Sequence, residues 1–266
     1  MLRKTPTIVI TVKNRLEHFL KTFPFNVTQV GIDYRLVYVD YDSEDNFSEH
    51  LIKEIENKKD IFSRNLLEIR LVKLNKKARY DIRRAKNLGA YYASRYSSIL
   101  LISDADTMLG MDYTKKWCSY ITPGETFVTN RIQESMAQLP RRIKQEVNYG
   151  NIIVATQDFD SVLGYDETNV GWGGDDDDLF HRLKLAGLRE INPYSFDDAS
   201  QYSIMHSDEL RFKDTENPNM ERPDSAETAK AFKKIYSNKS NILSLKYDYF
   251  SPIVQNFSKE RVLYEN

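Results

Sequence analysis

Four adjacent aspartates, Asp175 to Asp178, follow a tryptophan and two glycines in the stretch GWGGDDDDLF (171–180). Neighbouring carboxylates repel one another, so each prefers water or a cation. An acid-rich first turn of a helix accounts for one or two of them, because the helix dipole favours negative charge there. It does not account for four beside Trp172, whose indole face could carry a sugar ring. One carboxylate of such a cluster could take a proton from an attacking hydroxyl.

A second acidic motif, Asp104-Ala105-Asp106, follows an apolar run in SILLISDAD (98–106). Two carboxylates at the end of a buried strand offer the hard oxygen ligands that Mg²⁺ and Mn²⁺ prefer. A turn or a helix N-cap is the alternative reading of this motif. The best distant candidate for another metal ligand is His206, in SIMHSDE, and its alternative is a structural or exposed histidine.

Basic residues are concentrated between Arg70 and Lys86, where eight lysines and arginines accompany one acid, Asp81. A solvated surface is the simplest reading of this run. The alternative is that Arg83, Arg84 or Lys86 neutralises a diphosphate. The run lacks interleaved aromatic residues, the net charge of the chain is −1, and no helix-turn-helix pattern is present, so we expect no nucleic-acid partner. The common dinucleotide and P-loop motifs, GxGxxG and GxxxxGK[ST], are also absent.

The elements that must position these residues alternate between strand and helix in the first half of the chain. The strands predicted there are 6–12, 35–41, 67–74 and 98–106, and the helices are 15–23, 48–59 and 80–96. This alternation predicts an α/β fold with a mostly parallel sheet covered on both faces. Ligands of such sheets bind at the carboxyl ends of the strands. Residues at the predicted strand ends include Thr11, Lys13, Asp40, Asp104 and Asp106, so we expect one polar site at this edge.

The second half is less regular, and no linker divides the 266 residues, so we expect one domain with two functional halves, 1–110 and 111–210, and an extension, 211–266. We predict helices at 112–121, 138–147, 178–187 and 225–237, a strand at 151–157, a loop at 208–224 and an aromatic tail at 244–253. One cysteine excludes an intramolecular disulfide. No apolar run approaches the roughly 20 residues of a membrane span, and the start reads as a strand, so we expect a cytoplasmic protein, with a place at the inner face of the membrane as the open alternative. Whether the aromatic tail touches a membrane or packs in the core is left open.

Taken together and in this order, the motifs resemble those of GT-A glycosyltransferases, above all the β-1,4-galactosyltransferase family and related family 2 bacterial enzymes. That family carries GWGGEDDD, where this chain has GWGGDDDD (171–178), and R-N-R-x-E-H-L, where this chain has KNRLEHFL (13–20). It carries Asp-x-Asp after its fourth strand, and its N-R-A-K and N-x-G elements have short counterparts in residues 84–89. The likeness covers residues 6–210 and implies a GT-A fold, a Rossmann-like central sheet flanked by helices with an acceptor-binding C-terminal half.

The resemblance also implies roles for individual residues. Asp176 would be the catalytic base. The nucleotide-sugar would contact Thr11, Lys13, Arg15, Asp40, Arg84, Lys86 and Asp104. The acceptor sugar would contact Trp172, Gly173, Asp175 and Asp177. The metal would be held by Asp104, Asp106 and His206. The family has a glutamate where this chain has Asp175, and a methionine ligand where it has Ser203, so the third protein ligand stays open.

The function that this resemblance implies is inverting, Mn²⁺-dependent transfer of a sugar from a UDP-sugar to a saccharide or lipid-linked oligosaccharide, in bacterial surface polysaccharide or glycan synthesis. Mg²⁺ is the alternative metal. A sugar nucleotidyltransferase would need a glycine-rich loop after the first strand, which TVKNRLEH does not provide. A Ca²⁺- or carbohydrate-binding module would explain the aspartates but not the alternating strands and helices.

Overall fold

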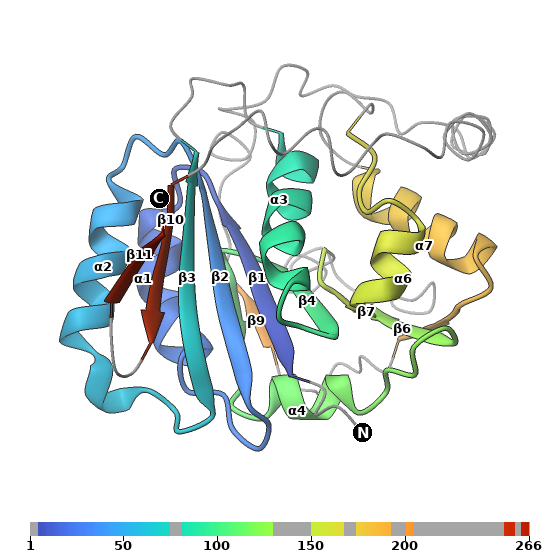
Figure 1. Cartoon of the computed structure of the whole chain (residues 1–266), viewed down its shortest axis with the longest axis horizontal. Coiled ribbons are helices and arrows are strands. Elements are labelled where there is room, and N and C mark those ends of the chain that lie inside the picture. The colour runs from blue at the N-terminus through green and yellow to red at the C-terminus, as the bar shows by residue number, and fades with distance from the viewer. Residues whose placement is uncertain are drawn as a thin grey trace, which may run out of the picture.

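The computed structural model describes residues 5–74, 81–129, 150–167, 174–192, 201–204, 253–258 and 262–265 (Figure 1). The predictions of a helix at 138–147, a loop at 208–224 and a helix at 225–237 lie outside these residues. So does the aromatic tail up to residue 252.

The predicted alternation of strands and helices in the first half is confirmed. Its elements are β1 (Pro6–Val12), α1 (Leu16–Asn26), β2 (Tyr34–Tyr41), α2 (Phe47–Asn57), the short 3₁₀ helix η1 (Lys59–Ile61), β3 (Leu66–Leu74), α3 (Ile82–Ser94) and β4 (Ile99–Asp104). Strands β3, β2, β1 and β4 lie side by side and parallel. These four strands form the centre of the main sheet (Figure 1).

The remaining described elements extend this sheet in both directions. They are β5 (Thr107–Leu109), α4 (Tyr113–Cys118), β6 (Thr126–Thr129), β7 (Ile152–Ala155), α6 (Thr156–Ser161), α7 (Asp175–Leu185), β8 (Arg189–Ile191), β9 (Gln201–Ser203), β10 (Ile253–Ser258) and β11 (Val262–Glu265). The nine-stranded order is β11-β10-β3-β2-β1-β4-β7-β6-β8, and β5 pairs with β9 in a second, small sheet. The pairings of β7 and β10 are antiparallel, so the sheet is mixed with a parallel centre.

Helices cover both faces of the sheet, which is why its central strands are apolar almost throughout. All seven residues of β1 are buried. Because successive side chains point to opposite faces, Ile8 and Ile10 join the aromatic side chains of α1 and α2, such as Phe19, in one core. Val9 joins α3, α6 and α7 in the other core. Figure 1 shows α3 on the near face and α1 and α2 behind the sheet.

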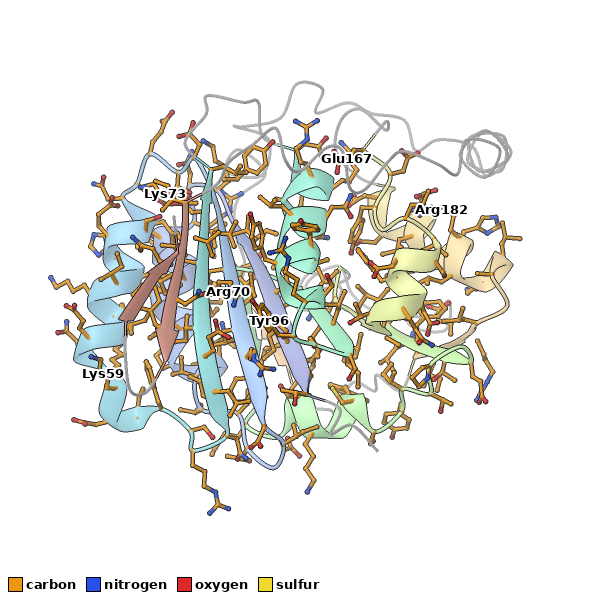
Figure 2. All side chains as sticks on the ribbon, viewed as in Figure 1. Lys59, Arg70, Lys73, Tyr96, Glu167 and Arg182 are labelled. Carbon is orange, nitrogen blue, oxygen red and sulfur yellow. The ribbon has the colours of Figure 1, made fainter. Side chains whose placement is uncertain are left out.

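The C-terminal strands β10 and β11 were not predicted from the sequence. Strand β10 pairs antiparallel with β3, with Ile69 opposite Phe257. The buried Arg70 crosses this seam, because its Nε lies 2.6 Å from Oδ1 of Asn256 and its guanidinium stacks 4.5 Å from the ring centre of Tyr96. Figure 2 shows Arg70 and Tyr96 on this part of the sheet. Part of the C-terminal extension therefore belongs to the main sheet.

The register of the central strands places the predicted polar residues at one edge. Thr11 is opposite Asp104 on one side, and the next residue, Val12, is opposite Asp40 on the other. Thr11 and Asp40 are buried, whereas the Asp104 side chain is partly exposed. Within the described ranges, no helix has the length and apolar character needed to cross a membrane.

Candidate active site

Lys86 lies at the centre of a buried charged cluster. Its side chain is 1% exposed, and its Nζ lies 3.1 Å from Oδ1 of Asp176, 3.6 Å from Oδ2 of Asp175 and 3.9 Å from Oδ1 of Asp104. The ring centre of Tyr165 is 4.9 Å from the same nitrogen. We call these five residues the Lys86 cluster. It joins the consecutive elements α3 and β4 to the start of α7, which is about 70 residues further along the sequence.

Helix α3 positions Lys86 in this cluster, because its N-terminus is capped and its middle packs close to the sheet. Asp81 is the N-cap, and its carboxylate accepts hydrogen bonds from the backbone N–H groups of Arg83 and Arg84. Gly89 allows the close approach, since a Cβ there would lie 2.3 Å from Val9 Cγ1. The first turns of α3 are thereby held over the carboxyl ends of the strands.

Helix α7 delivers the aspartates, and it begins three residues earlier than predicted. Gly174 is the N-cap with φ of 75°, a left-handed conformation that favours glycine, so all four aspartates fall in the first turn. Asp175 and Asp176 reach Lys86. The buried Asp178 instead pairs with Arg182, one turn further along the helix.

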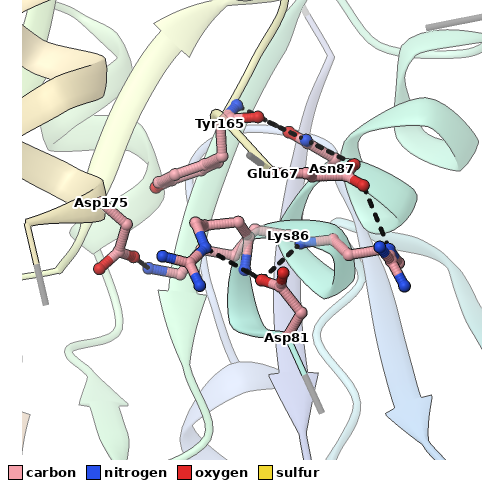
Figure 3. A network of polar contacts seen from close by, with 8 residues as sticks. Asp81, Lys86, Asn87, Tyr165, Glu167 and Asp175 are labelled. Carbon is pink, nitrogen blue, oxygen red and sulfur yellow. Dashed lines mark hydrogen bonds and ion pairs between the residues drawn. The ribbon is translucent and has the colours of Figure 1, made fainter. Parts of the chain in front are cut away.

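Arg182 fastens α7 to the turn after α6. It is 2% exposed, and its Nη1 donates to the backbone oxygens of Val162, at 2.6 Å, and Gly164. The next residue, Tyr165, is held by Asn87 of α3, whose Oδ1 accepts from the backbone N–H and whose Nδ2 donates to the carbonyl, both at 2.8 Å. Figure 3 shows Asn87 against the backbone of Tyr165, with the tyrosine ring turned toward Lys86 and Asp175.

Burial and charge shift the proton affinities in the Lys86 cluster. Burial acts to lower the pKa of Lys86, but the nearby carboxylates, Asp176 first, outweigh it and leave the pKa well above its ordinary value. Burial raises the pKa of Asp176 to about 8, opposed by Lys86 and reinforced by Asp175 and Asp104. Asp176 therefore binds a proton more strongly than an ordinary aspartate, which suits a general base near neutral pH.

The loops after β1 and β2 form the neighbouring part of the sheet edge. Asn14 Oδ1 accepts from the N–H of Glu44 at 2.8 Å, and the N–H of Asn14 donates to Ser43 Oγ at 3.2 Å. Asp45 accepts from the N–H of Leu16 at 2.8 Å, at the start of α1. We call residues 13–16 and 42–46 the paired loops.

Two predicted nucleotide contacts, Lys13 and Asp40, lie in or beside the paired loops. Lys13 Nζ donates to the backbone oxygen of Asp42. Asp40 accepts from the N–H of Ser43 at 2.9 Å and from the hydroxyl of Ser48. The structure thus places Asp40 at the predicted edge with both of its oxygens engaged by the chain.

Arg84 lies in α3 and Arg15 just before α1, two helices that pack into the cores on opposite faces of the sheet. The Nε of Arg84 is 3.1 Å from Oε2 of Glu167, whose other carboxylate oxygen accepts from Asn87 (Figure 3). Arg15 precedes α1, and its Nη1 is 3.2 Å from the carbonyl of Asn14.

Asp106 lies beyond β4, where β9 runs antiparallel to β5. Its carbonyl accepts from the N–H of Ile204 at 2.8 Å, immediately after β9. Among the described residues, no group of three or more histidine, cysteine or acidic side chains is arranged to hold a metal ion. Three predicted site residues, Trp172, Gly173 and His206, lie outside the described residues, so their placement stays a prediction.

Sequence reasoning did not select Tyr165, Glu167 or Gly150 for the site. A Cβ on Gly150 would lie 2.9 Å from Oδ2 of Asp104 and 3.2 Å from Oδ2 of Asp176, so this glycine leaves room between two predicted functional groups. Tyr165 and Glu167 stand in LGYDE, a few residues before the GWGG motif. That proximity was the only available signal for these two, because their contacts with Asn87 and Arg84 of α3 depend on tertiary packing.

Two comparisons with known proteins bear on this arrangement. Residues 131–233 match a family described as the N-terminal domain of galactosyltransferase, and this stretch includes the four aspartates, Trp172 and His206. No curated protein matches the chain significantly.

Solved structures of GT-A glycosyltransferases share the fold. A mannosyltransferase from Pyrobaculum calidifontis, in complex with GDP-Man and Mn²⁺, is 14% identical with a TM-score of 0.58 over 91% of this chain and 77% of that one. S. aureus TarS in complex with UDP is 13% identical with a TM-score of 0.54 over 89% and 72%. A Drosophila β-1,4-galactosyltransferase 7 variant, with manganese, UDP-Gal and xylobiose, is 14% identical with a TM-score of 0.50 over 85% and 79%. The predicted fold class and the resemblance to GT-A glycosyltransferases are thereby confirmed.

Proposed function

We propose that this protein is an inverting glycosyltransferase that moves a sugar from a UDP-sugar to a hydroxyl of a saccharide acceptor. The observation that carries the proposal is the Lys86 cluster, in which one buried lysine contacts both Asp104 at the end of β4 and Asp176 at the start of α7. Asp104, proposed for the donor side, and Asp176, the candidate base for the acceptor, thus lie within one ion-paired cluster. A single displacement requires the donor and the acceptor to be held next to each other.

The donor side is proposed to be the carboxyl edge of β1, β2 and β4. The paired loops are fixed by their own hydrogen bonds, so Lys13 and Asp40 are positioned before a ligand arrives. Thr11, Arg15 and Arg84 would complete the nucleotide contacts. Solved structures with this fold hold UDP or UDP-Gal in two cases and GDP-Man in a third, which makes UDP the first nucleotide to test and GDP the second.

The residues at the end of β4 fit a divalent cation, because Asp104 and Asp106 offer hard oxygen ligands two positions apart. The N–H of Ile204 donates to the carbonyl of Asp106. His206 follows Ile204 by two residues, and two residues of chain span at most about 7 Å, so the sequence keeps His206 close to the Asp-x-Asp motif. We propose Asp104, Asp106 and His206 as the ligands of Mn²⁺, or of Mg²⁺. A bound ion would stabilise the negative charge of the departing nucleotide.

In the proposed reaction, Asp176 accepts the proton of the acceptor hydroxyl. The oxygen then uses its freed electron pair to form a bond to the anomeric carbon, while the bond from that carbon to the UDP oxygen breaks and its pair leaves with UDP. Attack from the side opposite the leaving group inverts the anomeric configuration. Trp172, Gly173, Asp175 and Asp177 are proposed to bind the acceptor.

The acceptor class and the biological role belong to the same proposal. A saccharide or a lipid-linked oligosaccharide would suit an indole beside several carboxylates. The motifs resemble those of family 2 bacterial enzymes as well as galactosyltransferases, which supports a role in bacterial surface polysaccharide or glycan synthesis.

Release of UDP from UDP-Gal, UDP-Glc and UDP-GlcNAc, measured with Mn²⁺ and with EDTA, tests the activity. Calorimetry of UDP should show an affinity that falls sharply in EDTA and in Asp106→Ala. Release of pyrophosphate from UTP and a sugar phosphate would instead indicate a nucleotidyltransferase. Sugar binding without turnover would indicate a binding module, and NMR showing a retained anomeric configuration would exclude the single displacement.

A further inference from the structure

Two hydrogen-bond donors converge on the same oxygen of Asp176. The Nζ of Lys86 lies 3.1 Å from Oδ1, and the hydroxyl of Tyr165 lies 3.2 Å from that same Oδ1. An oxygen that accepts two such bonds is less available to a substrate proton than its partner oxygen.

The other oxygen of Asp176 faces a different neighbour. Oδ2 is the atom that a Cβ on Gly150 would meet at 3.2 Å, and Oδ2 of Asp104 would meet the same Cβ at 2.9 Å. The two Oδ2 atoms therefore lie on the same side of Gly150, where Lys86 Nζ would also be 3.7 Å from that Cβ. Since Asp104 belongs to the proposed donor side, Oδ2 is the Asp176 oxygen turned toward the donor.

Tyr165 is held in place independently of Asp176. Asn87 binds both backbone groups of Tyr165, and Arg182 binds the carbonyl of Gly164, just before it. The ring packs against Phe159, with 6.0 Å between ring centres, and the residue is 2% exposed. A hydroxyl fixed by this much surrounding structure can orient a neighbouring carboxylate without moving itself.

We propose that Tyr165 is a positioning residue that, with Lys86, holds Oδ1 of Asp176 so that Oδ2 is the oxygen that takes the proton. The inference rests on the proposed function, in which Asp176 is the base. The acceptor O–H bond breaks, its proton passes to Oδ2, and the electron pair on oxygen forms the new bond to the anomeric carbon as UDP leaves. Tyr165 touches none of the reacting atoms.

Tyr165→Phe tests this proposal because it removes the hydroxyl and keeps the ring. The readout is UDP release from UDP-Gal, UDP-Glc or UDP-GlcNAc with Mn²⁺, with water as the acceptor. We expect kcat to fall about 10- to 100-fold, the effect of losing a hydrogen bond to a charged group. The KM for the UDP-sugar and the Kd for UDP should stay within about threefold, because the hydroxyl contacts no part of the proposed nucleotide site.

A double-mutant cycle separates positioning from a structural role. In the Asp176→Asn background, Tyr165→Phe should have no further effect on kcat, because no base remains to be oriented. Tyr34→Phe is the matched control, since the buried hydroxyl of Tyr34 donates at 3.0 Å to the carbonyl of Asn26, at the other end of β2 from Asp40. That control should lower thermal stability and leave kcat unchanged.

Three results would overturn the proposal: normal kcat in Tyr165→Phe, an equal fold-loss in the wild-type and Asp176→Asn backgrounds, or parallel losses of kcat and UDP affinity. 3-Fluorotyrosine at position 165 keeps the test decisive if the phenylalanine variant does not fold. Its hydroxyl still donates to Oδ1 of Asp176, so kcat should stay within about twofold of the wild type at constant UDP affinity, and a loss as large as that expected for Tyr165→Phe would count against the proposal. A wild-type protein that releases no UDP, or a fully active Asp176→Asn, would instead refute the proposed function, and this inference with it.

Discussion

The paired loops are joined by hydrogen bonds in which at least one partner is a backbone group, whereas the Lys86 cluster is joined by ion pairs between the buried Lys86 and less deeply buried carboxylates. Asn14, Asp42 and Asn46 of the paired loops have φ between 52° and 58°, a left-handed conformation that costs free energy in residues other than glycine. None of these hydrogen bonds joins two charged groups, so the loops do not depend on a balance of opposite charges. The Lys86 cluster depends on its charge balance, so a change of charge should damage it far more.

The largest effect is expected on turnover. Asp176→Asn is nearly isosteric and removes only the proton acceptor, so kcat should fall roughly 10²- to 10⁴-fold while UDP affinity with Mn²⁺ changes a few-fold at most. Steady-state kinetics and calorimetry measure the two quantities. Asp177→Asn is the matched control and should raise the KM for the acceptor more than it lowers kcat. Near-normal turnover in Asp176→Asn would remove the base from the mechanism.

The second effect is on stability, and it compares the two regions directly. Lys86→Met leaves three carboxylates around a buried site that has lost its cation, so the free energy of unfolding should fall by about 3–5 kcal/mol. Lys13→Met removes one hydrogen bond in the paired loops and should cost about 1 kcal/mol. Urea denaturation gives both values. Equal losses would show that charge does not distinguish the two regions.

Asp178→Asn tests the support behind the cluster. The substitution weakens the charge-assisted hydrogen bonds to the buried Arg182, so the free energy of unfolding should fall by about 1.5–3 kcal/mol. Below the melting temperature, kcat should stay within about threefold, because Asp178 faces Arg182 and not Lys86. Thermal unfolding and UDP release check this together. A large loss of kcat at unchanged stability would assign Asp178 a direct role in the reaction.

The smallest effect is expected from Asp45→Ala, in the paired loops. Asp45 accepts the N–H of Leu16 at the first turn of α1, and losing such a cap costs about 1 kcal/mol. UDP affinity should fall about fivefold, because Asp45 holds Leu16 at the end of the other loop, which carries Lys13. Calorimetry with UDP and Mn²⁺ provides the measurement. Unchanged affinity at reduced stability would separate the loop from the nucleotide site.

The polar edge of the sheet could be predicted because the sequence patterns that indicate it are local. Apolar runs with helices between them imply parallel strands, and parallel strands bring Asp40 and Asp104 to the same side. The start of α7 was placed three residues too late, because aspartate has low helix propensity and the left-handed conformation of Gly174 is not visible in a sequence. The partners of Lys86 could not be predicted, since Asp176 is 90 residues away and the pairing depends on tertiary packing.

The pairing of β10 with β3 has a consequence for how the chain is made. Ile253 is opposite Lys73, and Val254 is opposite Val72. The free edge of β3 can therefore be paired only after the ribosome has added a segment that lies 180 positions later in the chain. At 5–20 residues per second, that delay is roughly 10–40 s. During this time the nascent chain presents an unpaired strand edge, to which another copy on the same polysome or a chaperone could bind before β10 emerges.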